Sequence, residues 1–317
     1  MDRAFVLVAP SKSDPCHIPV HTHALEAPVS QPVTVIGLGP MGQAMAAAYL
    51  DRGYEVTVWN RTPSRADALV ERGATLAADP EQALLANELV ILSLIDYDAM
   101  YTALRGAEHA VAGRVLVNLS SDTPQKAREA ARWVTELGGT HLTGGVLSPP
   151  PGIGSPDMST FYSGPRAAYD KHRAALEVIT GKTDHRGQDP GLAALMYQLN
   201  MVIFWPAMLS YWQAVALAAT HGLTAADIAP YAAENFAGMG QFLDFYAPRI
   251  DAGNHAGDVD RISMGLASME HVVHTNADAG VDTAFPRAVL DAFRRGTDAG
   301  YGADSFSRLV ELLKQPA

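Results

Sequence analysis

Short apolar runs separated by helical patterns dominate the first two thirds of the chain. One of them, residues 89–94, is apolar at every position but Ser93, which is typical of a strand covered by helices on both faces. We expect strands at residues 33–36, 56–59, 74–76, 89–94, 115–118, 140–147, 158–163 and 183–186. Strands that alternate with helices predict an α/β fold with a doubly wound, mostly parallel sheet.

The next segment is one long apolar stretch. Residues 191–220 carry no charged side chain. Asp189 and Pro190 form a typical helix start, and Gly222 is a typical stop. A helix from Gly191 to His221 would be about 46 Å long, and a helix that is apolar almost all round needs a partner on every side. Pro206 and several polar residues interrupt it and no basic flank follows, so we expect an interdomain helix buried by a second subunit, not a membrane span.

The rest of the chain is helical by pattern, with helices expected at residues 224–236, 239–251, 260–280, 285–300 and 305–314. The patterns together predict four segments. These are a flexible leader (1–31), an α/β domain (32–188), the interdomain helix (189–221) and an all-α C-terminal domain (222–317).

The turn after the first strand has the spacing Gly-x-Gly-x-x-Gly. Gly37 permits a tight turn, Gly39 lets the backbone approach a pyrophosphate, and Gly42 lets the next helix pack close to the strand. That helix offers unpaired N–H groups and a positive dipole end to phosphates. The residues expected to contact the cofactor here are Gly37, Leu38, Gly39, Pro40, Met41 and Gly42. Because strand, turn, helix and second strand follow in order, the pattern predicts a Rossmann dinucleotide-binding domain.

The end of the second strand distinguishes NAD from NADP. An acidic residue there would accept a hydrogen bond from the ribose 2′-hydroxyl and repel a 2′-phosphate. This chain instead has Asn60, Arg61 and Thr62, with Arg65 one turn later. The planar guanidinium of arginine can donate two parallel hydrogen bonds to a phosphate, and the neutral side chains of Asn60 and Thr62 add hydrogen-bond donors. The sequence therefore predicts NADPH.

Polar residues also follow the fourth and fifth strands. Ser93 and Leu94 end the fourth strand, and Ser120 and Asp122 follow the fifth. Ligands of doubly wound sheets bind at the carboxyl ends of the strands. We expect Ser93, Leu94 and Ser120 to contact the cofactor, and Asp122 is the one acid at this edge.

Composition narrows the function classes. The 317-residue chain is 48% hydrophobic and 18% charged, as an ordinary globular enzyme is. Its net charge of −11 argues against nucleic acid and anionic membranes as partners. The single cysteine, Cys16, fits a reducing cytoplasm. Cys16 and the nearby histidines lack a second cluster of ligands, so no metal is expected.

Several motifs together resemble a known family. They are residues 37–42, 60–62, 118–124, 144–164, 191–200, 257–261, 270–275 and 279–286. The chain resembles the β-hydroxyacid dehydrogenase superfamily over about residues 33–313, and more closely its NADPH-dependent imine reductases. The resemblance implies a Rossmann domain, a long interdomain helix and a helical C-terminal domain. It also implies a domain-swapped homodimer, with the active site between one subunit's Rossmann domain and the partner's helices.

Departures from the hydroxyacid pattern separate the two activities. Hydroxyacid dehydrogenases carry a catalytic lysine where this chain has Tyr197, while Asn200 keeps their asparagine. Their carboxylate-binding Ser-Gly-Gly loop corresponds to Leu147, Ser148 and Pro149. Proline has no N–H to offer a carboxylate, and leucine has no polar side-chain group. The base and the anion site are therefore both missing, which weakens the hydroxyacid alternative.

The resemblance implies reduction of a small cyclic imine such as 2-methyl-1-pyrroline, with (S)-selectivity typical of members that carry the tyrosine. We expect Tyr197 to donate a proton or hydrogen bond to the imine nitrogen; an ordinary core tyrosine is the alternative. We expect Asn200 to orient either Tyr197 or the nicotinamide amide; a hydrogen bond between helices is the alternative. Asp122 either polarises the iminium or caps the helix that follows. The expected substrate pocket comprises Leu147, Met201, Trp205, Met239 and Phe242. A β-hydroxyacid dehydrogenase and a non-catalytic NADPH-binding sensor remain alternatives.

Overall fold

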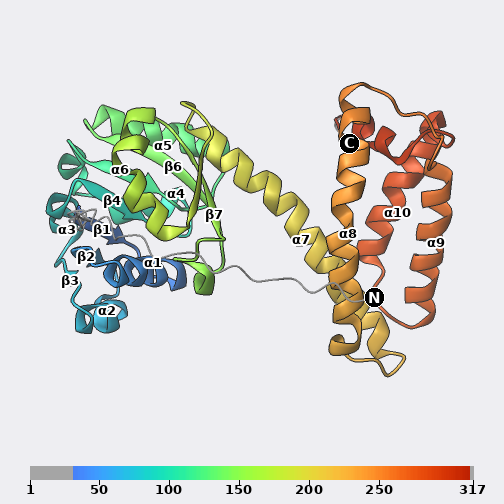
Figure 1. Ribbon diagram of the computed structural model, residues 1–317, viewed down its shortest axis with the longest axis horizontal. Coiled ribbons are helices and arrows are strands. Elements are labelled where there is room, and N and C mark those ends of the chain that lie inside the picture. Colours follow the sequence, from blue (N-terminus) through green and yellow to red (C-terminus); the bar gives the residue numbers. More distant parts are fainter. Residues whose placement is uncertain (1–30, 315–317) are drawn as a thin grey trace, which may run out of the picture. The chain divides into compact units, whose positions relative to one another are not determined.

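The structure, a computed structural model, describes residues 31–314 (Figure 1). Apart from Gln31, the predicted leader with Cys16 lies outside the described residues. The chain divides into two units between Tyr197 and Gln198. Each unit is described by itself below.

The first unit is built on one sheet, which has eight strands within the described residues. The strands are β1 (Val33–Ile36), β2 (Val56–Trp59), β3 (Thr75–Leu76), β4 (Leu89–Leu92), β5 (Val115–Asn118), β6 (Thr140–Leu147), β7 (Ser159–Ser163) and β8 (Lys182–His185). Their order is β3-β2-β1-β4-β5-β6-β7-β8, and every pair is parallel except β6 with β7. The predicted doubly wound, mostly parallel sheet is confirmed.

Helices cover both faces of this sheet, which is why β1, β4 and β5 are buried at every position. The helices of the first unit are α1 (Pro40–Asp51), α2 (Asp67–Glu71), α3 (Pro80–Ala86), α4 (Tyr97–Ala103), α5 (Pro124–Glu136) and α6 (Arg166–Ile179). On one face α1 and α6 contribute Tyr49 and Ile179 to a core with Val35. On the other, α4 and α5 contribute Met100 and Val134 to a core with Leu116.

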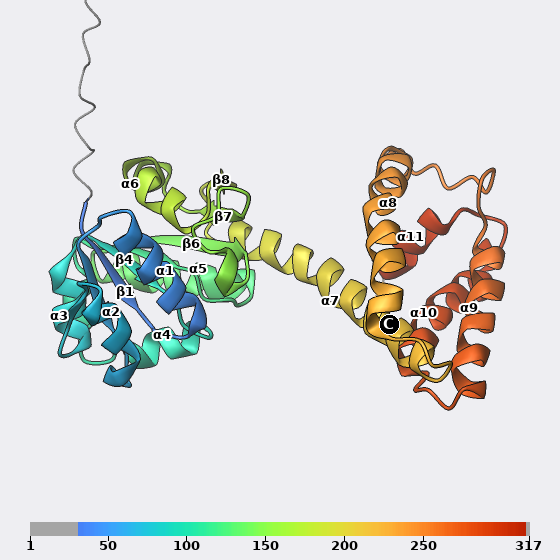
Figure 2. The ribbon, with the colours of Figure 1, turned by 60° about the horizontal axis from the view of Figure 1, so that its bottom comes forward.

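The second unit is helical. Its helices are the later part of α7 (Gly191–Ala219), then α8 (Ala225–Asp251), α9 (Ile262–Asp278), α10 (Ala284–Gly296) and α11 (Leu309–Leu313). A π-helical turn, Thr297–Tyr301, follows α10. α9 and α10 lie side by side (Figures 1 and 2), and they pack so closely that a Cβ on Gly265 would lie 2.2 Å from the Phe293 ring.

One expectation about the second unit was wrong. Residues 224–236 and 239–251 were expected to form two helices, but α8 runs without a break through both and includes Gly238 and Gly240. A glycine inside a helix costs only about 1 kcal/mol relative to alanine, and no proline stands in the expected gap. The capping box of Thr224 and Asp227 starts the helix firmly.

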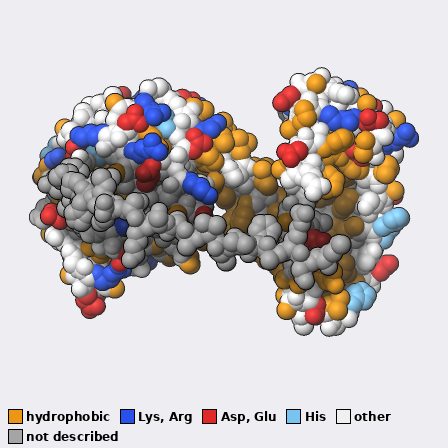
Figure 3. Space-filling model, in the orientation of Figure 1, with side chains coloured by type: hydrophobic (Ala, Val, Ile, Leu, Met, Phe, Trp, Pro, Cys, Tyr) orange, Lys and Arg blue, Asp and Glu red, His pale blue; other side chains and the backbone are white. Residues whose placement is uncertain are grey.

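The predicted long helix is present as α7, with 29 residues and Pro206 inside it. By length and composition it is the one helix in the described residues that could cross a membrane. Only 11% of its most apolar window is buried within the chain, and hydrophobic side chains gather along it in Figure 3. Val202 and Ile203 are 70% and 71% exposed. The start of α7 is buried, at Ala193 and Ala194, while most of its later part is exposed in the single chain.

Candidate active site

The first and third glycines of the fingerprint are required by the protein's own packing. Gly37 has a φ of +95°, and a Cβ on it would lie 2.4 Å from the Ser93 carbonyl oxygen. A Cβ on Gly42 would lie 1.9 Å from the Gly37 carbonyl oxygen. Neither neighbour is a flexible side chain, so both positions exclude any larger residue. This is the close helix–strand packing expected from the sequence.

The middle glycine is different. Gly39 has an ordinary backbone conformation, with φ −69° and ψ 179°, and a Cβ on it would meet no described atom within 4 Å. It is the N-cap of α1, where no side chain caps the helix and Pro40 holds the first position. The first-turn N–H groups of an uncapped helix have no intrahelical partner and attract anions. The open space over Gly39 is thus a cradle that a Cβ would fill, and it fits the pyrophosphate of NADPH.

The end of β2 is joined to this turn through Asn60. Its side-chain oxygen accepts a hydrogen bond from the Leu38 N–H at 2.9 Å, and its nitrogen donates to the Thr62 carbonyl at 3.0 Å. Asn60 therefore holds the two loops together, in addition to the donor role expected from the sequence. Arg61 and Arg65 are exposed beside it. With no acid at residues 60–66, these guanidinium groups are the ones that can hold a 2′-phosphate.

The structure brings the predicted residues of the neighbouring strand ends together. The Ser93 N–H donates to the Ile36 carbonyl at 2.9 Å, and the Leu94 N–H donates to the Ser120 hydroxyl at 3.3 Å. The Leu94 side chain lies against Gly37. Both residues lie beyond β4, which ends at Leu92 and not at residue 94 as expected. The carboxyl ends of β1, β4 and β5 thus form one edge beside the glycine turn.

Asp122 lies at the starts of two helices, and its predicted role at the iminium stays a prediction. Its carboxylate accepts hydrogen bonds from the Thr123 N–H at 2.7 Å and from the Tyr97 N–H at 3.5 Å. The N-cap of α5 is Thr123, whose hydroxyl accepts from the Lys126 N–H. Asp122 therefore bridges the starts of α4 and α5 and does not itself cap α5.

Tyr197 lies where α7 packs on β6. A Cβ on Gly145 would lie 2.8 Å from the Tyr197 Cβ and 3.0 Å from the Ala193 carbonyl oxygen, so the helix rests directly on the strand backbone. In the sheet, Thr143 pairs with Asn118 of β5. Gly145 lies two residues further toward the carboxyl end, at the same edge as Ser120. Tyr197 is therefore near the edge that carries the residues expected to contact the cofactor.

The other expected substrate residues lie in separate parts of the chain. Leu147 ends β6 in the first unit, opposite Ser159. Asn200 and Met201 follow Tyr197 on α7, in the second unit. Trp205, Met239 and Phe242 also belong to the second unit and are 56%, 49% and 57% exposed.

Comparison with known proteins identifies the family. Residues 32–187 match the NAD-binding domain of 6-phosphogluconate dehydrogenase, and residues 189–315 match the C-terminal domain of NADPH-dependent reductive aminase-like proteins. The chain is 30% identical to the NADPH-dependent reductive aminase of Aspergillus oryzae over 289 residues, which cover 90% of this chain and 98% of that protein. The chain belongs to the imine reductase family.

Solved imine reductases agree closely in sequence and fold. One from Streptomyces aurantiacus is 87% identical, with a TM-score of 0.88, covering 90% of this chain and 100% of its own. One from Bacillus cereus is 55% identical, with a TM-score of 0.80, covering 90% of this chain and 99% of its own. The predicted family, fold class and NADPH cofactor are confirmed, as is an oxidoreductase activity on C=N bonds. The comparisons thus favour an imine reductase over the hydroxyacid dehydrogenase and the sensor.

Proposed function

We propose that this imine reductase reduces small cyclic imines and iminium ions to amines, with Tyr197 at the reacting nitrogen. The observation that carries the proposal is the position of Tyr197, packed on Gly145 at the sheet edge that holds the cofactor residues. A lysine at this position would serve as the base of a hydroxyacid dehydrogenase. A phenol is a weak acid and suits donation to a nitrogen.

In this proposal, one set of residues binds the cofactor and another acts on the substrate. NADPH, when bound, supplies the hydride. The glycine turn and the start of α1 would hold its pyrophosphate, and Arg61 and Arg65 would hold its 2′-phosphate. Tyr197 donates a proton or a hydrogen bond to the imine nitrogen, and Asn200, three residues further along the helix, helps to orient the reacting groups. Because a protonated iminium is already electrophilic, placement of the two reactants is the main task of the protein.

The test is NADPH consumption with 2-methyl-1-pyrroline by the wild type and Tyr197→Phe. Loss of a general acid typically lowers the rate by about 10²-fold or more. Full kcat/KM in the phenylalanine variant would remove the acid role. NADP⁺ reduction with 3-hydroxyisobutyrate tests the hydroxyacid alternative, and NADPH binding without turnover in either assay would indicate a sensor. Chiral analysis of the amine tests the (S)-selectivity that we also propose.

We further propose that a second copy of the chain covers α7 and α8. The reason is the exposure of apolar side chains along both helices, including Val202, Ile203 and Leu243. Exposed apolar surface of this extent is typical of interfaces. Light scattering at micromolar protein is expected to give the mass of a dimer, and a monomer would contradict the proposal. A cytoplasmic location remains a prediction from the sequence.

A further inference from the structure

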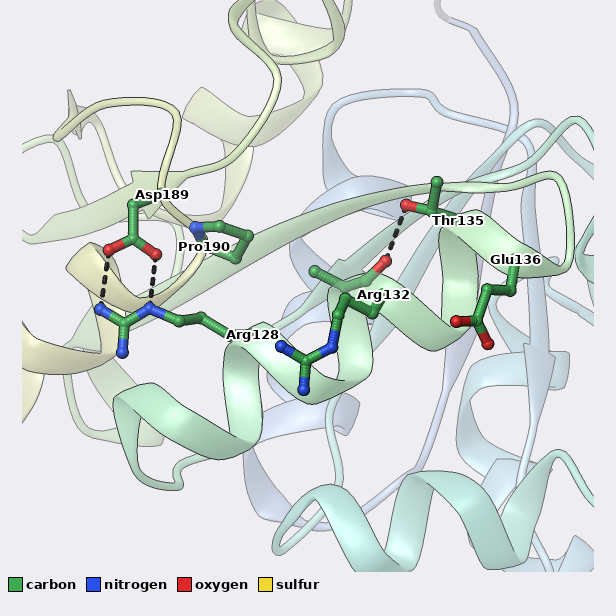
Figure 4. A pocket seen from close by; sticks show the side chains of 7 residues that line it. Arg128, Arg132, Thr135, Glu136, Asp189 and Pro190 are labelled. Atoms are coloured by element: carbon green, nitrogen blue, oxygen red, sulfur yellow. Dashed lines mark hydrogen bonds and ion pairs between the residues drawn. The ribbon is translucent and has the colours of Figure 1, made fainter.

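A surface groove of about 480 Å³ lies where α5 meets the segment before α7 (Figure 4). At its edge the guanidinium of Arg128 makes two parallel hydrogen bonds to the carboxylate of Asp189, Nε to Oδ1 at 2.8 Å and Nη2 to Oδ2 at 2.7 Å. The two residues are 61 positions apart in the chain. This fork fixes the direction of both side chains, which a single hydrogen bond would not do.

Asp189 also holds the start of α7. Its Oδ1 accepts the Gly191 N–H at 3.0 Å, and its hydrogen bonds from Arg128 and then Gly191 keep the pKa of its carboxyl below the ordinary value. Asp189 is therefore ionised at neutral pH. A Cβ on Gly191 would lie 2.7 Å from the Arg128 Cζ, so the guanidinium also packs against the first residue of the helix.

A second anchor comes from the sheet. The hydroxyl of Ser163, which is fully buried at the end of β7, donates to the Pro190 carbonyl at 2.8 Å. The same oxygen accepts the Ala193 N–H at 3.0 Å. Asp189 and Ser163 thus satisfy two N–H groups of the first turn, which a helix cannot satisfy by itself.

The anchors are close to Tyr197. Tyr197 lies six positions after Gly191, about 9 Å along the helix axis. A tilt of about 5° at the anchored end would move Tyr197 by about 0.8 Å over that length. Displacement of a reacting group by about 1 Å can lower a rate by about 10²-fold.

We propose that Arg128, Asp189 and Ser163, named here the α7 clamp, are positioning residues that aim Tyr197 at the substrate nitrogen. The inference rests on the proposed role of Tyr197. The side chains of Arg128 and Asp189 are 41% and 40% exposed, and ion pairs that are so exposed contribute little to stability. The ion pair therefore acts mainly through geometry.

The experiment compares Arg128→Ala, Arg128→Lys and Ser163→Ala with Arg132→Ala as the matched control. Arg132 lies one turn further along α5 and lines the same groove. We expect Arg128→Ala and Ser163→Ala to lower kcat about 10-fold with 2-methyl-1-pyrroline, while the dissociation constant of NADPH stays within twofold. Lysine keeps the charge but not the fork, so Arg128→Lys should recover part of the loss. Arg132→Ala should match the wild type. A kcat within twofold of wild type in folded Arg128→Ala and Ser163→Ala would overturn the clamp.

The same substitutions in a Tyr197→Phe background separate the clamp from the proposed function. If the clamp acts through the phenol, Arg128→Ala lowers kcat less than twofold once the hydroxyl is gone. A full 10-fold further loss in that background would mean that the clamp acts elsewhere. If Tyr197→Phe alone keeps full kcat/KM, the acid role fails and the clamp loses its target. If Tyr197→Phe is impaired while the clamp variants are not, only the clamp fails.

Discussion

The substitution Gly39→Ala tests whether the glycine turn is shaped for a ligand or for the fold. A Cβ on Gly39 meets no described atom within 4 Å and its φ of −69° suits alanine. Replacing glycine by alanine at an N-cap lowers the free energy of unfolding by about 0.5–1 kcal/mol. Alanine also makes the unfolded chain less flexible, which raises the free energy of unfolding by about 0.4–1 kcal/mol. The free energy of unfolding should therefore change by less than about 1 kcal/mol.

The effect on the cofactor should be much larger. The added methyl group lies where the backbone would approach a pyrophosphate, and each hydrogen bond to a charged group contributes about 1.5–3 kcal/mol. Loss of one such bond weakens NADPH binding about 10- to 100-fold. The assay is a fluorescence titration with NADPH, together with urea denaturation of the cofactor-free protein.

Gly42→Ala is the matched comparison. Its Cβ would lie 1.9 Å from the Gly37 carbonyl oxygen, so helix and turn must separate, at a cost of about 2–3 kcal/mol. The reasoning is refuted if Gly39→Ala binds NADPH within twofold of the wild type. It is also refuted if Gly39→Ala destabilises the fold as much as Gly42→Ala does.

Three further predictions concern charge, packing and pH. Arg61→Ala should raise the KM for NADPH about 10-fold or more in steady-state assays, because the arginine is expected to hold the 2′-phosphate. The KM for NADH should change little, because NADH carries no 2′-phosphate. Equal changes in the two KM values would contradict this prediction. Gly145→Ala places a Cβ 2.8 Å from the Tyr197 Cβ. It should lower the free energy of unfolding in urea denaturation by about 1–3 kcal/mol and should also lower kcat. An unchanged kcat would show that catalysis does not need this contact. Burial lowers the pKa of His141 to about 4, and neither ring nitrogen has a hydrogen-bond partner among the described residues. The unfolded chain takes up this proton near pH 6.5 and the folded protein only near pH 4, so the free energy of unfolding should fall by about 3 kcal/mol as the pH drops across that window. His141→Gln should make this fall shallower in urea denaturation at each pH, and an identical slope would contradict the assignment.

The local features of the fold were predictable from the sequence. The buried strand β4 is a continuous apolar run, and the glycine turn and the start of α7 at Asp189 depend on residues that are neighbours in the chain. Backbone conformation and solvent exposure of such segments follow from nearby side chains. For the same reason the absence of an acid after β2 was enough to predict NADPH.

The roles of individual polar side chains were decided only by the tertiary structure. Asn60 joins two loops, and Asp122 bridges the starts of two helices. The sequence also predicted two helices where α8 is one, because two glycines near its middle suggested a break that the packed helix does not have.

The α7 clamp shows most clearly what the sequence alone could not predict. Nothing near Arg128 in the chain marks it as a partner of Asp189, because the two meet only when α5 and the segment after β8 pack together. Backbone patterns therefore determined which elements form and which cofactor they bind. The packing of distant elements determined where each side chain points, since a hydrogen bond depends on a few tenths of an ångström that no periodicity encodes.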